Sequence, residues 1–467
     1  MSGLFSTLNA SVKALSAQSR ALEVTGKNLA NVNNPSYARQ RVIFGDRGTV
    51  ETPEGAESLG LEALGIQQLR DGLLDKQVMR EIALTASMTA EQQTYQRTQA
   101  SLGQAVGGTT EANGVGGGLG GAIDDFFNAF QSFASRPTDD GEKQTLLQRA
   151  SILTDRFQQT DSRLVQVQSD IDTQIAGDVA DANRLLASIA DLNKQIGRIE
   201  TGRPGIAIDL RDQREARLEE LAAKIPVQTR TGANGMINVV MKDASNADVL
   251  LVDGLTVTGP FAFTGTTFTG GASATVLVTP TGSVAGFLNA RDGTVQTLRD
   301  QLDLLAEQMV TAVNSAYNPT NAAGFNFFDP AGLTASAIGT DAALTASSIR
   351  AGIGGAGENS LALAVAALAS QVFSTGSGNV INGTLNRFYV SAASDLGQAL
   401  ATVNAQLDDQ AGIEKLVRTQ RDSVSGVSLD EEMAELVRYQ RAFQASSRVF
   451  GIIDGLLDIV VNRLGTF

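Results

Sequence analysis

Both ends of this 467-residue chain carry an apolar residue at every seventh position. The positions are Leu8, Leu15, Leu22 and Leu29 near the N-terminus, and Leu429, Leu436, Phe443, Phe450, Leu457 and Leu464 near the C-terminus. A seven-residue apolar repeat forms a narrow stripe along a helix, and such a stripe is buried best against another helix. We therefore expect the two ends to pair as a coiled coil, a layout that favours a subunit stacking with its copies over a catalyst.

A terminal amphipathic helix can also dock on its own domain, which is an alternative to pairing of the two ends. Both stripes keep the period of seven, and neither end has an obvious partner domain beside it in the sequence. These two features favour pairing of the ends with each other.

The composition excludes several kinds of chemistry because the chain contains no His and no Cys. Catalytic Ser-His-Asp and Cys-His sites are ruled out, as are metal sites built from imidazole or thiolate. Carboxylate sites for Ca²⁺ or Mg²⁺ and paired-carboxylate catalysis remain open. The formal charge of −14 disfavours binding to nucleic acid or to an anionic membrane.

Targeting signals are weak in this sequence. It has no apolar run of about 20 residues that would span a membrane. Residues 1–22 interleave polar and apolar positions and lack the continuous apolar block of a secretory signal. We expect either a cytosolic protein or one that leaves the cell by a route without a cleaved peptide.

Hydrophobic periodicity predicts helices along most of the chain and strands in one region. Helices are expected at residues 4–32, 69–102, 122–135, 141–199 (allowing for one break), 210–224, 286–317, 361–373 and 385–424, with a terminal helix after residue 426. Residues 36–44 look extended, and 45–65 look irregular. From 226 to 281 the β-branched and Gly-rich sequence predicts five to seven strands, including a hairpin around Asn234-Gly235.

The predicted fold class is mainly α with a β insert. The predicted domains are a coiled-coil domain of paired terminal helices (1–35 and 429–467), an elongated helical bundle (36–225 and 286–428) and a small all-β domain (226–285).

Other motifs have plain structural explanations. Residues 116–121 fit G-x-G-x-x-G, but no strand precedes them, so a glycine-rich linker is the better interpretation. Asp243, Asp248 and Asp253 do not have the spacing of an EF-hand loop and suit turns at strand ends. The charged stretch 209–221 is interpreted as an exposed helix face with i,i+4 pairs, with contact to another domain or subunit as the alternative.

Two terminal motifs resemble the signatures of flagellar axial proteins. The first runs from Asn28 to Tyr37 (NLANVNNPSY) and continues with Arg39-Gln40, and the second runs from Ser425 to Met433 (SGVSLDEEM) and continues with Tyr439-Gln440. Together they are similar to the hook-associated protein 1 family. The motif positions are Asn28, Asn31, Asn33, Pro35, Tyr37, Arg39, Gln40, Ser428, Leu429, Glu432, Tyr439 and Gln440. Asn34 and Ser36 stand where that family usually has Thr and Gly.

The resemblance implies a structural role in the bacterial flagellum. It implies a self-assembled ring that joins hook to filament, with the terminal helices innermost and the β domain facing solvent. The expected partners are further copies, hook protein, the next hook-associated junction protein and an export chaperone at the C-terminal helix. The resemblance also implies type III export without a cleaved peptide and an extracellular location. It implies neither a cofactor nor an enzymatic activity.

Three alternatives stay open. The first is another flagellar axial protein of the rod or hook. The second is a carboxylate-dependent hydrolase of cell-wall glycan, for which the β region offers Asp243, Asp248 and Asp253 without a recognisable catalytic spacing. The third is an adhesin role confined to residues 226–285.

Overall fold

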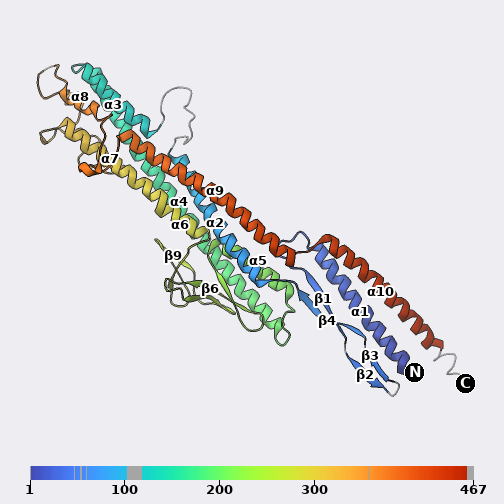
Figure 1. Cartoon of the computed structure of the whole chain (residues 1–467). Coiled ribbons are helices and arrows are strands. Elements are labelled where there is room, and N and C mark those ends of the chain that lie inside the picture. Colours follow the sequence, from blue (N-terminus) through green and yellow to red (C-terminus); the bar gives the residue numbers. More distant parts are fainter. Residues whose placement is uncertain are drawn as a thin grey trace. The chain divides into compact units, whose positions relative to one another are not determined.

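The computed structural model describes residues 2–46, 48–52, 55–58, 60–102, 118–355 and 357–459 (Figure 1). Over these residues the chain is mainly helical with short antiparallel sheets, as the sequence predicts. It divides into two compact units. Unit 1 comprises Met1–Leu84, Val179–Pro280 and Gln410–Phe467, and unit 2 comprises Thr85–Asp178 and Thr281–Asp409. The domain boundaries predicted from the sequence stay a prediction.

Unit 1 contains both terminal helices and the strands. Its elements are α1 (Ser2–Ala30), β1 (Gln40–Asp46), β2 (Thr49–Thr52), β3 (Gly55–Ser58), β4 (Leu61–Gln68), the first part of α2 (Gly72–Ser101), the last part of α4 (Asp140–Glu200), α5 (Ile208–Lys224), the strands β5 to β11, the last part of α9 (Leu385–Ser425) and α10 (Leu429–Asp458). α1 ends at Ala30, five residues before Pro35, in keeping with the helix-breaking effect of proline on the residues before it.

The strands after α5 form two small antiparallel sheets. They are β5 (Gln228–Thr231), β6 (Ile237–Lys242), β7 (Asp248–Asp253), β8 (Thr256–Val257), β9 (Ala262–Thr264), β10 (Thr267–Gly270) and β11 (Thr275–Leu277). The strand orders are β5-β6-β7-β8 and β11-β10-β9. The predicted hairpin is confirmed, with Asn234 and Gly235 at φ values of 49° and 71° between β5 and β6. Positive φ at both turn residues is what Asn-Gly favours.

Unit 2 is a helical unit with an aromatic core. It contains the rest of α2, α4 and α9, together with α3 (Leu119–Ser135), α6 (Ser283–Ala290), the π-helix η1 (Arg291–Val295), α7 (Gln296–Tyr317), α8 (Ser360–Ala367) and the 3₁₀ turn η2 (Thr375–Ser377). Phe126 and Phe130 of α3 meet Phe327, with ring centroids 5.1–5.6 Å apart. All three rings are fully buried, so the few aromatics of the chain are concentrated where they exclude water.

Two regions differ from the sequence-based expectation. Residues 45–65, predicted to be irregular, contribute the hairpin β2–β3 and the strand β4, which pairs with β1. The strand β4 also packs on α1, and that tertiary contact stabilises strands in a Gly- and Glu-rich sequence. The helix expected over 361–373 ends at Ala367, and Phe373 instead forms a bridge with Gly383.

Gly286 lets α6 pack closely on α2 within unit 2. A Cβ at this position would clash with the backbone carbonyl of Ser87, which a helix cannot easily move. We expect Gly286→Ala to lower the free energy of unfolding by about 1–3 kcal/mol. Gly293 in η1 is the matched control, because nothing lies within 4 Å of its added Cβ.

Urea unfolding of both variants checks this packing prediction. Gly293→Ala should leave the unfolding free energy unchanged or raise it by up to about 1 kcal/mol, since Ala favours helix more than Gly. Equal midpoints for the two variants would show that α6 and α2 do not depend on the close approach.

Candidate assembly interface

The terminal helices α1 and α10 lie side by side in unit 1 (Figure 1). On α1 the most deeply buried apolar side chains are Ala17, Ala21 and Val24, spaced as one helix face. On α10 they are Ile453 and Leu457. Ala21 and Val24 pack with Val42 of β1, and Tyr439 of α10 packs against the same cluster, so this face of α1 contacts β1 as well as α10.

The predicted apolar stripes are only partly covered within one chain. Leu8, Leu15, Leu22, Leu29, Leu436 and Phe450 are half-buried, Leu457 is buried and Phe443 is 37% exposed. Leu464 lies outside the described residues. Their role in contacts between copies stays a prediction.

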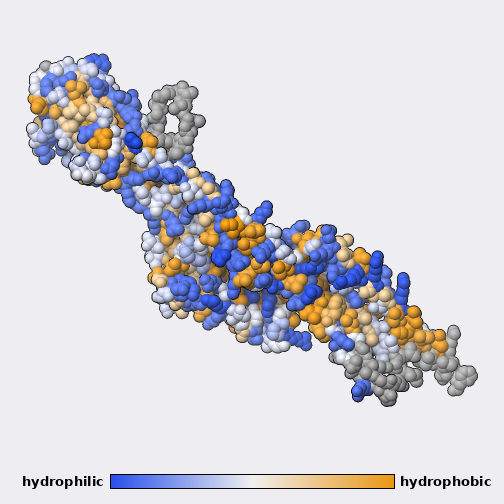
Figure 2. Space-filling view, in the orientation of Figure 1, coloured by the Kyte–Doolittle hydropathy of each residue, from blue (hydrophilic) through white to orange (hydrophobic). Residues whose placement is uncertain are grey.

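Much of the apolar surface of α10 faces water. Its most exposed apolar side chains are Leu429, Met433, Val437, Phe443, Val449, Ile452, Leu456 and Ile459, of which Ile452 is 66% exposed. Figure 2 shows hydrophobic surface on this part of the molecule. Scattered apolar residues on a surface are ordinary, but eight of them along one helix form a candidate interaction surface, which we call the apolar row.

Asn28 connects α1 to β1 and α10 through four hydrogen bonds. Its amide Nδ2 donates to the Gln40 carbonyl (2.9 Å) and to Glu432 Oε2 (3.0 Å). Its Oδ1 accepts from the Tyr37 hydroxyl (2.8 Å) and from the Gln40 N–H (3.0 Å). These bonds use both donors and both lone pairs of the amide. A buried asparagine at this position is therefore fully satisfied.

Tyr37 stays neutral in this arrangement. Burial raises the pKa of its hydroxyl above the ordinary value, and the nearby carboxylates of Asp212, Asp209 and Glu432 raise it further. A neutral phenol retains the O–H group that donates the hydrogen bond to Asn28 Oδ1.

Arg39 joins β1 to the start of α10. Its Nε donates to Glu432 Oε1 (2.7 Å) and its Nη1 to Glu431 Oε2 (2.6 Å). The Glu432 side chain is 2% exposed, whereas that of Glu431 is 63% exposed. The Arg39 N–H also donates to the carbonyl of Ser425, at the end of α9. One residue thus holds the turn between the two C-terminal helices.

The helix α5 also contacts the residues that surround Asn28 and Arg39. Lys27 of α1 pairs with Asp209 (2.5 Å), and Gln40 Nε2 donates to the same carboxylate (3.3 Å). Arg421 of α9 donates to the Pro35 carbonyl (3.2 Å) and pairs with Glu219 of α5 (2.5 Å).

The charged stretch 209–221 therefore has two roles within the chain. Arg217 and Glu220 form an exposed i,i+3 pair. Asp212 and Arg214 are buried, so only part of the stretch is the solvent-facing helix that the sequence predicts. Asp209 and Glu219 instead make the contacts described above.

The remaining motif residues occupy the edges of this site. Asn31 is half-buried and its Nδ2 donates to the Lys27 carbonyl (2.9 Å), closing the last turn of α1. Tyr439 is half-buried and its ring lies 6.1 Å from that of Phe44, centroid to centroid. The exposed motif residues are Asn33, Pro35, Ser428, Leu429 and Gln440.

Sequence reasoning missed Arg421. It is a single arginine without a motif of its own, and Pro35 and Glu219, which it contacts, lie far away in sequence. No local pattern singles it out.

Two of the aspartates considered for other chemistry make contacts within the β region. Asp243 accepts hydrogen bonds from the N–H groups of Ser245 and Ala247 in a turn. Asp248 pairs with Lys242 (2.6 Å) and Arg230 (3.0 Å). Within the described part of the chain, no group of three or more acidic residues is arranged to hold a metal ion, and no helix is long and apolar enough to cross a membrane.

Three family models match the sequence. "Flagellar hook-associated protein FlgK helical domain" matches residues 109–328, "Flagella basal body rod protein" matches 8–37, and "Flagellar basal body rod FlgEFG protein C-terminal" matches 418–464. The last two cover most of α1 and α10.

Curated relatives match over nearly the whole chain. Flagellar hook-associated protein 1 of Bacillus subtilis is 24% identical over 100% of this chain and 99% of that protein. The Salmonella typhimurium and Escherichia coli K12 proteins of the same name are 23% and 22% identical over 98% of this chain and 99% of each relative. The structure of the flagellar hook junction protein FlgK from Burkholderia pseudomallei matches with a TM-score of 0.45 and 19% identity, over 54% of this chain and 46% of that chain.

Proposed function

We propose that this chain, which belongs to the flagellar hook-associated protein 1 family, is a structural adaptor at the junction between hook and filament. The family models and the full-length relatives of that name support this role. In the proposed assembly, copies form a ring through α1 and α10, with hook protein on one side and the next hook-associated junction protein on the other. The protein acts by binding and carries out no reaction.

One observation carries the proposal. Asn28, Arg39 and Glu432 hold the start of α10 to α1, and the apolar row along α10 remains in water. Burial of apolar surface is worth roughly 25 cal/mol per Å², so copies that cover this row gain stability on assembly. We infer that Leu8, Leu15, Leu22, Leu29 and the corresponding residues of α10 complete their burial against neighbouring copies.

The same surface needs protection before assembly. We propose that an export chaperone covers the apolar row of α10 until the chain leaves the cell through the flagellar type III apparatus, without removal of a signal peptide. The mature protein then belongs to the external part of the flagellum. Hydrophobic rows of this kind otherwise promote aggregation.

A deletion strain tests the adaptor role. We expect cells lacking this protein to build hooks without filaments and to release filament protein into the medium, with filaments restored by the intact gene. Electron microscopy of detached hooks is the measurement. Filaments of normal length in the deletion strain would contradict the proposal, and cells without hooks would instead favour a rod or hook protein.

A further inference from the structure

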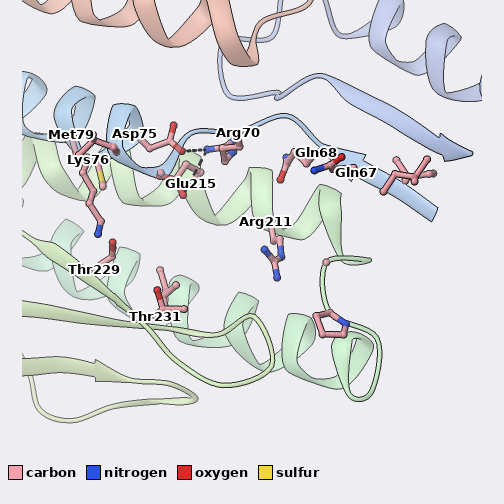
Figure 3. Close-up of a pocket in the computed structure, with 17 residues that line it drawn as sticks. Gln67, Gln68, Arg70, Asp75, Lys76, Met79, Arg211, Glu215, Thr229 and Thr231 are labelled. Atoms are coloured by element: carbon pink, nitrogen blue, oxygen red, sulfur yellow. Dashed lines mark hydrogen bonds and ion pairs between the residues drawn. The ribbon is translucent and has the colours of Figure 1, made fainter. Parts of the chain in front are cut away.

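Three carboxyl groups surround one guanidinium group in unit 1. Arg70, which lies between β4 and α2, contacts Asp75 Oδ2 at 3.4 Å and Glu215 Oε2 at 3.8 Å (Figure 3). It also contacts Asp212 Oδ1 at 2.8 Å. Asp75 lies in the first turn of α2, and the other two acids lie on α5. We call these four residues the Arg70 cluster.

The Arg70 cluster is buried and incompletely paired. The side chains of Asp75, Asp212 and Glu215 are 7%, 10% and 15% exposed. Asp75 Oδ1 and Asp212 Oδ2 are both shielded from solvent without a hydrogen-bond partner among the described residues. Three ionised carboxylates around one cation would leave an excess of negative charge away from water, which is unfavourable.

Neighbouring cations are held by other partners. Arg421 pairs with Glu219, which also pairs with Arg418 (3.3 Å). Arg214 donates to the Asn193 side chain (2.9 Å) and to the Gly235 carbonyl (2.7 Å). Both acceptors are uncharged, so the charge of Arg214 also acts to lower the pKa of Glu215, but burial outweighs this effect.

Charged groups farther from the Arg70 cluster also have partners of their own. Arg211 pairs with the buried Glu200 (2.5 Å), and Asp209 pairs with Lys27. In Figure 3 the side chain of Lys76 extends toward Thr229, away from Glu215.

We propose that the folded chain holds a proton on the Arg70 cluster near neutral pH and gives it up on unfolding. One carboxyl group stays neutral, so two carboxylates and one guanidinium remain charged. A cavity of about 680 Å³, lined in part by Arg70, Asp75 and Glu215, opens the cluster to water and gives the proton a route in and out. The inference concerns the single folded chain and does not depend on the proposed assembly.

The expected pKa values agree with this geometry. Burial raises the pKa of Asp212 to about 6 and that of Glu215 to about 7, and it also raises the pKa of Asp75. Because the three groups share one cation, the proton belongs to the cluster and not to a single residue.

Holding this proton links pH to the anchoring of the terminal helices. Arg70 also donates to the Ser36 carbonyl (3.2 Å), and Asp212 accepts from Gln68 at the end of β4. Between the unfolded pKa of about 4 and the folded values of about 6–7, the folded state binds more protons than the unfolded state. Stability from the cluster is therefore fully present below about pH 4 and is lost as the pH rises through about 6–7.

The absence of histidine makes the proton directly countable. We expect unfolding by guanidinium chloride in unbuffered solution at pH 6.5 to release about one proton per chain, measured by pH-stat. Ordinary carboxyl groups are ionised at this pH in both states, and the amino terminus is largely protonated in both. The double variant Asp75→Asn/Glu215→Gln should release clearly fewer protons than the parent chain, because amides replace two of the three groups that share the proton and leave Asp212 paired with Arg70.

A matched control separates the cluster from other acids of the same helix. Glu220→Gln removes an exposed carboxyl group of α5 and should release the same number of protons as the parent chain. The proposal is overturned if the parent releases no proton at pH 6.5, or if the double variant releases as many protons as the parent. Neither outcome bears on the adaptor role, which the deletion strain tests separately.

Discussion

Replacing Glu432 by Ala is expected to lower the free energy of unfolding by about 3 kcal/mol, the lower end of the cost of breaking a buried ion pair. The Glu432 carboxylate is 2% exposed and accepts from both Arg39 and Asn28. Its removal leaves one amide hydrogen of Asn28 buried without an acceptor. Arg39 keeps Glu431 as a partner, which holds the cost near the lower end of the range.

The neighbouring residue provides the control for this prediction. Glu431→Ala removes a carboxylate that pairs with the same arginine but is 63% exposed. Exposed ion pairs contribute about 0–1 kcal/mol, so the unfolding free energy should change by less than about 1 kcal/mol. Urea unfolding of the two variants compares them directly, and hydrogen exchange should show faster exchange in α1 and α10 for Glu432→Ala alone. Equal losses for both variants would mean that the buried network does not hold the helix pair.

Substituting Ile452 by Asp is expected to abolish assembly while leaving the single chain folded. Ile452 is 66% exposed, so the change costs the isolated chain little. In an assembled ring the carboxylate would be buried against a neighbouring copy without a partner, at a cost of about 3 kcal/mol or more per contact. That is a loss of more than about 100-fold in affinity at each interface. Phe443 lies nine residues away, on about the opposite face of α10, so Phe443→Asp tests whether that face is also covered in the ring, and we expect it to impair assembly as well.

Filament counts and swimming in complemented deletion cells measure this effect. Ile452→Leu keeps the apolar surface and is expected to restore filaments. The amount of variant protein in the medium separates failed export from failed assembly. Full-length filaments at normal numbers on cells carrying Ile452→Asp would show that this face of α10 is not an interface between copies.

The sequence located the main elements of the fold where local rules are strong. Periodic apolar residues predicted the helices, and Pro35 marked the region in which α1 ends. Asn234-Gly235 marked the hairpin between β5 and β6, since few residue pairs accept positive φ at two successive positions. The lack of His and Cys excluded whole classes of chemistry, because those classes require an imidazole or a thiolate.

The sequence was less informative where tertiary contacts outweigh local preference. Residues 45–65 read as irregular, but pairing with β1 and packing on α1 make β4 a strand. The heptad leucines identified the two terminal helices, yet the most deeply buried apolar residues of α1 are Ala17, Ala21 and Val24, and the last two pack with Val42 of β1. A sequence repeat predicts which residues share one face of a helix. How deeply each of them is buried depends on the surface against which that face packs.

What the sequence alone determined is the chemistry available and the segments able to form helices or strands, because both follow from residue types and short spacings. What only the tertiary structure decided is which distant side chains meet. Asn28 and Glu432 lie 404 residues apart, and Arg70 and Asp212 lie 142 apart. Such contacts form when the chain folds back on itself, and the charge and hydrogen-bonding needs of each group are then met by partners that no local pattern specifies.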